Sequence, residues 1–177
     1  EMRLLDSAGM EVPRGDIGEI CVRGPHVMAG YRKRPDLTAE VLRAGWLHTG
    51  DLARLDEDGF VYIQGRLSEA INVGGFKVYP LEVEQTLREC EAVAECAAFA
   101  VPDERLGQVV HVWVTAATGH VPQPQALRDH CAARLAHYKV PRRIGVTQHL
   151  PRTGVGKLAR NQLTPVGLGD MPAFATP

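Results

Sequence analysis

The sequence lacks a long apolar run, an excess of charge of either sign and a recognisable metal-binding pattern. Its apolar stretch over residues 92–101 is interrupted by Glu95 and falls far short of the roughly 20 residues that a membrane-spanning helix needs. Its 20 basic and 21 acidic residues leave a formal net charge of −1, so nothing in the overall charge favours nucleic acid or an anionic membrane. We therefore expect no nucleic-acid partner and no transmembrane segment.

The four cysteines also lack any pattern that would pair them or place them around a metal. They are Cys21, Cys90, Cys96 and Cys131. No two of them form a CxxC pair, and no histidine stands at the spacing of a zinc site. We interpret them as buried free thiols of a reducing compartment. Because the first residues do not resemble a secretion signal either, the sequence predicts a cytoplasmic protein without a metal site.

The first third of the chain contains short alternating segments that are separated by turn residues. This pattern predicts β-strands, and Asp58-Gly59 predicts a hairpin. A proline at position 35 predicts a short helix that continues to Leu42, and we expect residues 45–51 to form a polar loop. The expected strands are residues 2–5, 19–23, 52–55 and 60–64. Residues 1–65 thus read as a small β-rich subdomain.

After Arg66 the pattern changes to strands that alternate with helices. A hairpin is expected around Gly74-Gly75, a helix from Pro80, and an amphipathic helix over residues 123–135. The expected strands of the sheet are residues 93–101, 109–117 and 143–147. The fold class is therefore α+β: the β-rich subdomain, a hinge at residues 66–69, and a mobile C-terminal α+β domain with a three-stranded sheet and flanking helices over residues 70–177. We expect the Gly- and Pro-rich tail from Pro165 to be loosely ordered.

Three side chains could carry chemistry, although each has a simpler structural explanation. Asp51 could accept two hydrogen bonds from a sugar diol, or it could cap a turn. Arg66 could bind hydroxyls or a phosphate, or it could form a surface ion pair of little energetic value. Lys157, in the glycine-rich PRTGVGKLAR, could reach a phosphate and a carboxylate together, but its spacing does not fit a Walker loop. Taken singly, each residue is better explained by structure than by function.

The pair Gly74-Gly75 is a further unusual feature. Glycine allows positive φ or a close approach of the backbone to another group. Because Arg66 and Lys77 flank the pair, we expect a bend here at which something anionic or narrow is held.

Read together, several segments share their order and spacing with one family. They are GEICVRGPHVMAGY (18–31), GWLHTGD (45–51), DGFVYIQGR (58–66), INVGGFKVYPLEVE (71–84), VPDERLGQ (101–108), YKVPRRI (138–144) and LPRTGVGKLAR (150–160). The chain, from about residue 2 to about residue 164, resembles the adenylate-forming superfamily of acyl-CoA synthetases, adenylation domains and luciferases.

This resemblance implies a ligase that works in two steps. A carboxylate attacks the α-phosphate of ATP to give an acyl-adenylate and pyrophosphate, and a thiol, usually coenzyme A, then displaces AMP to give a thioester. A fixed cation near the phosphorus lowers the barrier of the first step. A rigid-body rotation of the C-terminal domain then brings the residues for the second step to the site. By motif position, the implied roles are ribose binding for Asp51 with help from Arg66, the hinge for Glu69, the pantetheine tunnel for Gly74 and Gly75, and the catalytic lysine for Lys157.

The sequence departs from the family in two ways. Most members have aspartate at the hinge, where this chain has Glu69; the carboxylate is kept, but the extra methylene means that the family's local backbone hydrogen bonding does not carry over directly. The phosphate-binding loop, the YGxTE-type adenine and magnesium segment, and the acyl pocket are missing. We therefore expect a C-terminal third of the enzyme that is inactive alone, with ATP/AMP and coenzyme A used by the parent. Mg²⁺ is expected for the parent too, but its ligands are not in this chain.

Two alternatives remain open at this point. Adenylation domains that load a carrier protein more often read KIRGxRIE after the hinge and NGKVDR at the lysine, so NVGGFKVYP and GVGKLAR favour the coenzyme A ligases. A non-catalytic docking module or a homodimer is the other alternative, because residues 1–65 would expose apolar strand surface in isolation. The carboxylic acid that is activated cannot be read, since its pocket lies in the missing region.

Overall fold

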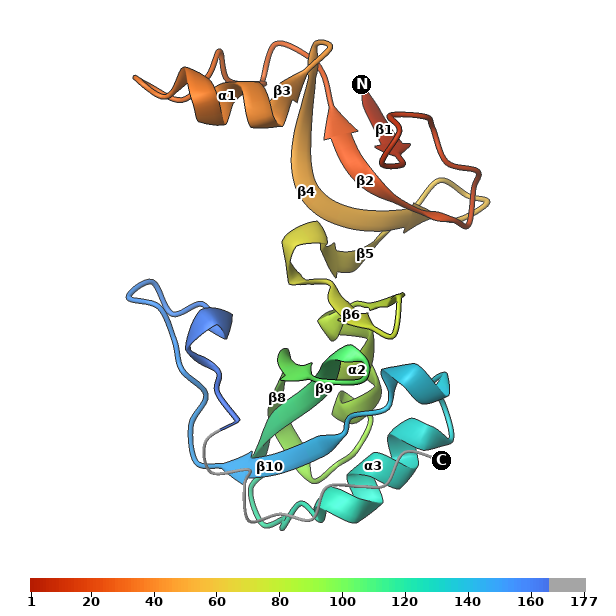
Figure 1. The fold of residues 1–177 in the computed structure, drawn as a ribbon, viewed down its shortest axis with the longest axis vertical. Coiled ribbons are helices and arrows are strands. Elements are labelled where there is room, and N and C mark those ends of the chain that lie inside the picture. The colour runs from red at the N-terminus through yellow and green to blue at the C-terminus, as the bar shows by residue number, and fades with distance from the viewer. Residues whose placement is uncertain (166–177) are drawn as a thin grey trace. The chain divides into compact units, whose positions relative to one another are not determined.

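The computed structural model describes residues 1–165, and the chain divides into two compact units between Ser68 and Glu69 (Figure 1). Unit 1 comprises Glu1–Ser68, and unit 2 begins at Glu69. The division falls inside the segment predicted as a hinge, whereas its motion stays a prediction. Apart from Pro165, the tail that was expected to be loosely ordered lies outside the described residues.

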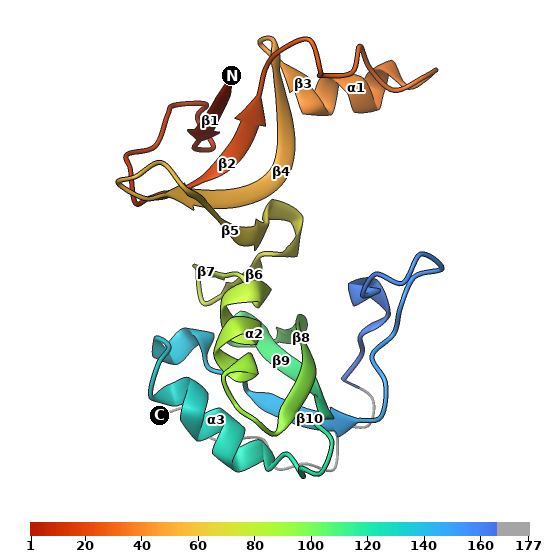
Figure 2. The ribbon, with the colours of Figure 1, turned by 180° about the vertical axis from the view of Figure 1, so that it is seen from behind.

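Unit 1 is built on a five-stranded antiparallel sheet with one short helix. The strand order is β1-β2-β4-β3, and β5 pairs with β4. The helix α1 begins with Pro35, as the sequence predicted. Strand β4 is long and bent in both ribbon views (Figures 1 and 2). The elements are β1 (Met2–Leu5), β2 (Ile17–Val22), α1 (Pro35–Val41), β3 (Leu42–Arg43), β4 (Trp46–Leu55) and β5 (Val61–Arg66).

The prediction of a polar loop at residues 45–51 was wrong, because β4 already begins at Trp46. Leu47 lies between two strands and pairs with Val22 on one side and Leu42 on the other. The side chains of His48 and Thr49 form hydrogen bonds to β2. The Thr49 hydroxyl, for example, donates to the Ile20 carbonyl at 2.9 Å. Composition alone suggested a loop, but cross-strand partners make the stretch a strand.

Unit 1 buries little apolar surface and exposes much. Its buried apolar residues are Leu4, Leu5, Cys21, Leu52 and Ala53. The large side chains at positions 60–63 are exposed, from 66% for Phe60 to 38% for Val61. Because successive strand residues point to opposite faces of a sheet, both faces of β5 carry exposed apolar side chains, Val61 and Ile63 on one and Tyr62 on the other.

Unit 2 combines a mixed sheet with two α-helices. Strands β8 and β9 are antiparallel, β9 and β10 are parallel, and the order is β10-β9-β6-β7 with β8 paired to β9. The elements are η1 (Leu67–Glu69, which spans the division), β6 (Ile71–Val73), β7 (Phe76–Val78), α2 (Pro80–Arg88), β8 (Val93–Asp103), β9 (Gly107–Ala116), α3 (Pro124–Ala132), η2 (His137–Lys139), β10 (Arg143–Thr147) and η3 (Arg160–Gln162). No helix among the described residues is long and apolar enough to cross a membrane.

The α+β fold class is confirmed, but the sheet of unit 2 is larger than predicted. The three expected strands are β8, β9 and β10. The glycine hairpin β6–β7 joins them because Val73 pairs with Gly107 at the start of β9, and the Gly74 N–H donates to the Leu106 carbonyl at 2.9 Å. The sheet therefore has five strands, because two strands expected to stand apart extend its edge.

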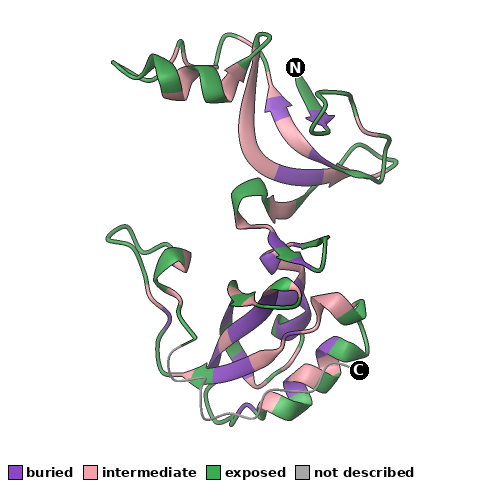
Figure 3. Cartoon of the chain, in the orientation of Figure 1, coloured by how far each residue is buried: buried purple, intermediate pink, exposed green. Residues whose placement is uncertain are grey.

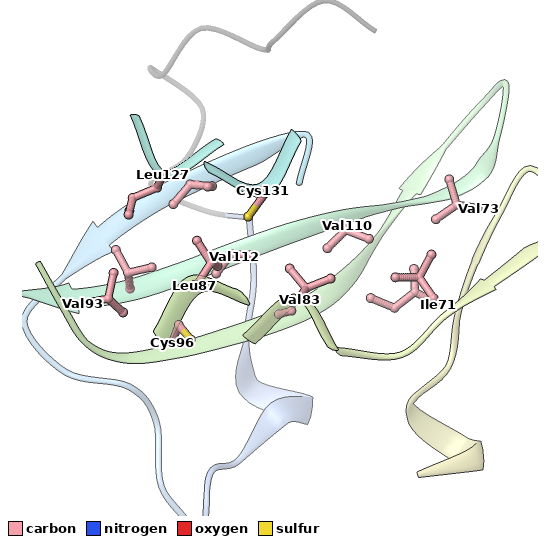
Figure 4. Packing of buried hydrophobic residues seen from close by; sticks show 14 residues of the cluster. Ile71, Val73, Val83, Leu87, Val93, Cys96, Val110, Val112, Leu127 and Cys131 are labelled. Atoms are coloured by element: carbon pink, nitrogen blue, oxygen red, sulfur yellow. The ribbon is translucent and has the colours of Figure 1, made fainter. Parts of the chain in front are cut away.

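The core of unit 2 is one cluster of 14 buried residues between the sheet and the helices (Figure 4). Alternate residues of β9 point into it. From the helices, Val83 and Leu87 of α2 and Leu127 and Cys131 of α3 complete it. Figure 3 shows the buried residues gathered on the strands of this sheet. The contributions from β9 are Val110, Val112 and Val114.

All four cysteines are free thiols, and the prediction of burial holds for Cys21, Cys96 and Cys131. Cys90 is only partly buried. Burial raises the pKa of Cys96 and of Cys131 to about 12, so both thiols stay protonated and unreactive at neutral pH.

Candidate active site

Asp51 and Arg66 form an ion pair on neighbouring strands of unit 1. The two residues are direct partners in the β4–β5 register, and Arg66 Nε lies 2.9 Å from Asp51 Oδ1. The Arg66 side chain is 60% exposed, so the pair adds little stability. The contact joins Asp51 Oδ1 to Arg66 Nε, and a carboxylate has a second oxygen and a guanidinium two further nitrogens with which to bind a ligand. The structure thus brings together two of the predicted site residues.

The backbone before Asp51 is fixed by Glu19, which our sequence reasoning did not select. Gly50 takes a φ of +74°, and its N–H donates to Glu19 Oε1 at 2.9 Å. Thr49 Oγ1 accepts the Asp51 N–H at 3.1 Å. Glu19 lies far from Asp51 in sequence, and only the pairing of β2 with β4 brings them together. The signal that could have found it is the Glu of GEI ahead of the HTGD segment.

Glu19, Cys21 and His48 bring three potential metal-ligand atoms within 4.8 Å of one another. However, His48 Nδ1 lies 2.7 Å from Glu19 Oε2 and 3.3 Å from Cys21 Sγ. Two ligands bound tetrahedrally at about 2.0–2.1 Å from zinc would stand about 3.3 Å apart, so the shorter distance describes a hydrogen bond. Burial, with a smaller effect of the Glu19 charge, raises the pKa of Cys21 to about 11. We interpret the trio as a hydrogen-bonded network.

Gly74 and Gly75 form the two-residue turn of the β6–β7 hairpin. Their φ values are +57° and +89°, which suits a type I′ turn and explains why both positions favour glycine. A Cβ on Gly74 would lie 3.3 Å from Leu106 Cδ2, whereas a Cβ on Gly75 would meet nothing within 4 Å. The turn alone accounts for the double glycine, and the open space lies beside Gly75.

A cavity of about 770 Å³ opens next to this turn in unit 2. Its wall includes Gly74 and a stack of Phe76 on Tyr138, whose ring centroids are 4.6 Å apart. Three arginines, at positions 105, 128 and 142, also line it. Sequence reasoning missed this cavity because its residues come from several separate elements. Flat rings and guanidinium groups together suit a ligand that has both an aromatic base and phosphates.

Lys157 lies at the end of a tight turn. The base of the turn is closed by a bridge between Arg152 and Leu158, and the Thr153 N–H donates to the Lys157 carbonyl at 2.7 Å. The Lys157 N–H donates to Thr153 Oγ1 at 3.2 Å. The side chain is exposed, and within residues 1–165 its ammonium group makes no ion pair. The turn therefore presents a positive charge that a ligand can reach.

Glu69 is the first residue of unit 2. Its carboxylate is bound by Arg160, whose Nε lies 2.9 Å from Glu69 Oε2. The side chain of the predicted hinge residue is thus held by unit 2 itself.

Residues 82–157 match the family described as the AMP-binding enzyme C-terminal domain. The fatty acid–[acyl-carrier-protein] ligase ScoC of Streptomyces coeruleorubidus is 42% identical over 95% of this chain. The chain belongs to the AMP-binding, adenylate-forming enzymes. Within this family, the long-chain-fatty-acid–CoA ligase of Salmonella typhimurium is also 42% identical, over 92% of the chain.

Solved structures of the AMP-binding enzymes show the same fold. The o-succinylbenzoate CoA synthetase MenE of Bacillus subtilis, in complex with the acyl-adenylate intermediate OSB-AMP, has a TM-score of 0.83 and 37% identity over 99% of this chain. The chain spans 32% of ScoC, 29% of the Salmonella ligase and 34% of MenE. It therefore corresponds to about a third of each relative.

Proposed function

We propose that this chain supplies the C-terminal part of an ATP-dependent carboxylate–coenzyme A ligase, with Lys157 as the catalytic cation of the first step. The observation that carries the proposal is the exposed Lys157 ammonium group on a closed turn, at the end of the segment that matches the family. A flexible lysine would lose its orientation, whereas a lysine on a fixed turn can be aimed at one point.

In the first step, a carboxylate oxygen of the substrate attacks the α-phosphorus of ATP, and the bond to pyrophosphate breaks. Lys157 binds the incoming carboxylate and the α-phosphate, and it stabilises the charge on the phosphate oxygens. Asp51 holds the ribose hydroxyls, and Arg66 orients Asp51 through their ion pair. We expect Mg²⁺ to accompany the triphosphate, with its ligands in another part of the enzyme.

In the second step, the sulfur of coenzyme A attacks the acyl carbonyl, and AMP leaves as the thioester forms. The open space beside Gly75 admits the narrow pantetheine arm. The adjoining cavity, with its stacked rings and arginines, suits the adenine and phosphates at the other end of the same molecule. The open surface beside Gly75 and the neighbouring cavity together favour coenzyme A as the acceptor.

The change between the steps is a rotation about the junction at Ser68 and Glu69. Glu69 stays the proposed hinge residue. Arg160 holds its side chain on unit 2, and rotation about the backbone bonds from Ser68 to the N–Cα bond of Glu69 leaves this ion pair intact. Rotations of this kind concentrate on a few residues at element ends.

A carrier protein is the alternative acceptor, and the similarity to ScoC favours it. Thioester formation measured with coenzyme A and with a phosphopantetheinylated carrier protein distinguishes the two.

The exposed apolar residues 60–63 would be covered by the rest of the enzyme or by a second copy in a homodimer. Light scattering distinguishes these two cases, because it measures whether the chain is a monomer or a dimer. The free thiols support a location in the cytoplasm, where cysteines stay reduced.

The test is ATP–pyrophosphate exchange by a full-length enzyme that carries this chain. We expect Lys157→Gln to lower the exchange rate by about 10²–10³-fold, while thioester formation from supplied acyl-adenylate changes little. Lys33→Gln, at an exposed lysine of unit 1, is the control and should affect neither. Equal loss of both half-reactions in Lys157→Gln would remove Lys157 from this role. The 177-residue chain alone should show no exchange.

A further inference from the structure

Unit 2 contains a buried carboxylate, that of Glu84. The Glu84 side chain is only 2% exposed. Its Oε1 accepts the Ala98 N–H at 2.9 Å, and its Oε2 lies 3.2 Å from Nη2 of Arg88. A buried charge is costly unless such partners satisfy it.

Arg160 is the partner that connects Glu84 to other parts of the unit. Its Nη1 lies 2.5 Å from Glu84 Oε1 and also donates to the Ala98 carbonyl at 2.9 Å. Its Nε lies 2.9 Å from Glu69 Oε2. One guanidinium group thus joins α2, β8 and the first residue of unit 2. Burial works against the charge of Arg160, but Glu84 and Glu69 outweigh it and raise the pKa of the group.

Arg160 also stands at the exit of the Lys157 turn. Ala159, between the two, is buried, and its N–H donates to the Pro151 carbonyl at 2.8 Å. On the entry side, Arg152 binds Glu95 and donates to the Gly156 carbonyl at 3.0 Å. The turn is therefore held at both ends, and only the exit side is linked to Glu69.

We propose that Arg160 is a positioning residue that joins Glu69 and the Lys157 turn into one rigid body, anchored on buried Glu84. Rotation about the backbone between Ser68 and Glu69 then moves Lys157 together with the rest of unit 2, because Arg160 ties the hinge residue to the turn. This inference rests on the proposed function of Lys157.

The first test is hydrogen–deuterium exchange of the 177-residue chain. Arg160→Lys keeps a positive charge near Glu84 but cannot bridge to Glu69. We expect it to raise exchange at least about tenfold in residues 67–71 and 152–158. Arg152→Lys is the matched control and should raise exchange in residues 152–158 alone. The proposal is overturned when Arg160→Lys leaves residues 67–71 as protected as in the wild type.

Arg160→Lys could unfold the unit by leaving Glu84 poorly paired, so a second variant covers that case. The double variant Arg160→Met with Glu84→Gln removes both charges and is expected to stay folded. It should show the same increase in exchange at both segments. If it is folded and both segments stay protected, the proposal is wrong.

The second test uses the two half-reactions of a full-length enzyme. A displacement of about 1 Å can cost about 10²-fold in rate, so Arg160→Lys should slow ATP–pyrophosphate exchange by about that factor. Thioester formation from supplied acyl-adenylate should change by less than about threefold, which a general loss of folding would not spare. If Lys157→Gln abolishes exchange and Arg160→Lys does not slow it, this inference fails alone. If Lys157→Gln leaves exchange intact, the proposed function fails with it.

Discussion

The two units differ in how much of their own core they contain. Unit 2 surrounds a cluster of 14 buried residues with a five-stranded sheet and two helices. Unit 1 has a sheet of the same size, but it buries few large side chains and exposes Phe60, Tyr62 and Ile63. Unit 2 is thus built as a domain that can stand by itself, whereas unit 1 is built to be covered by another surface.

The candidate residues differ in the same way. In unit 1, Asp51 and Arg66 are direct partners on the adjacent strands β4 and β5. In unit 2, Lys157 and Gly75 lie on turns that project from a packed core. A fixed pair on a sheet suits a ligand that stays bound through both steps. Turns on a self-contained unit suit residues that act in different steps, because the unit can move as a whole between the steps.

The largest expected effect comes from separating the units. Residues 69–165 should unfold cooperatively as an isolated chain, because the whole cluster lies within them. Residues 1–68 should show no cooperative transition, because too little apolar surface is buried to offset the loss of chain entropy. Thermal unfolding followed by circular dichroism measures both. A cooperative transition of residues 1–68 at a similar temperature would contradict this contrast.

A core substitution in each unit sharpens the comparison. Leu87 is fully buried in unit 2, so Leu87→Ala should lower the free energy of unfolding by about 2–5 kcal/mol. Leu52 of unit 1 is buried, yet Leu52→Ala should cost less because its surroundings are loosely filled and can relax. Urea unfolding of the 177-residue chain compares the two. A larger loss for Leu52→Ala than for Leu87→Ala would reverse the assignment of the stable core.

Acid should weaken unit 2 through His111, a buried residue of β9. Burial lowers its pKa to about 4, and the charges of Arg143 and Arg142 add to the effect. The unfolded chain then binds a proton between about pH 6.5 and pH 4 that the folded chain does not, so stability falls as the pH falls through this window. The loss should reach about 3 kcal/mol. Urea unfolding at both pH values measures it, and His111→Phe, which cannot titrate, should flatten the dependence. An equally steep dependence in His111→Phe would exclude His111 as its source.

The smallest expected effect on stability is at the ion pair of unit 1. Arg66→Met should change the free energy of unfolding by less than about 1 kcal/mol, since the Arg66 side chain is mostly exposed. In a full-length enzyme, the same variant should raise the KM for ATP. Arg34→Met is the control because Arg34 forms a comparable exposed pair with Asp36, 2.7 Å apart, away from Asp51 in sequence. An unchanged KM in Arg66→Met would leave the pair as a surface contact only.

Local sequence signals predicted the parts of the fold that depend on neighbouring residues. The prolines at the starts of α1 and α2, the Asp-Gly turn between β4 and β5 and the strand expected over residues 109–117 are of this kind. Features that depend on distant partners were missed. Residues 46–51 look polar, yet their partners on β2 and β3 make them a strand.

The same limit applies to the candidate site. Family motifs named Asp51, Arg66 and Lys157, and the structure shows how the first two meet and how the turn of the third is held. The contacts of Glu19 and of Arg160 join residues that are tens of positions apart. No periodicity in the sequence reveals such contacts, because they are created by the strand order and by the packing of α2 on β8.

In this account, unit 2 supplies one residue for each step of the reaction, Lys157 for adenylation and Gly75 for thioester formation. The most direct measurement compares both half-reactions in Lys157→Gln, Gly75→Trp and Gly75→Ala of a full-length enzyme. Gly75→Ala is the matched control, since it carries the same backbone strain as Gly75→Trp without the bulk. We predict that Lys157→Gln loses adenylation alone and that Gly75→Trp loses thioester formation far more than Gly75→Ala does. Loss of the same half-reaction in Lys157→Gln and Gly75→Trp would contradict the account.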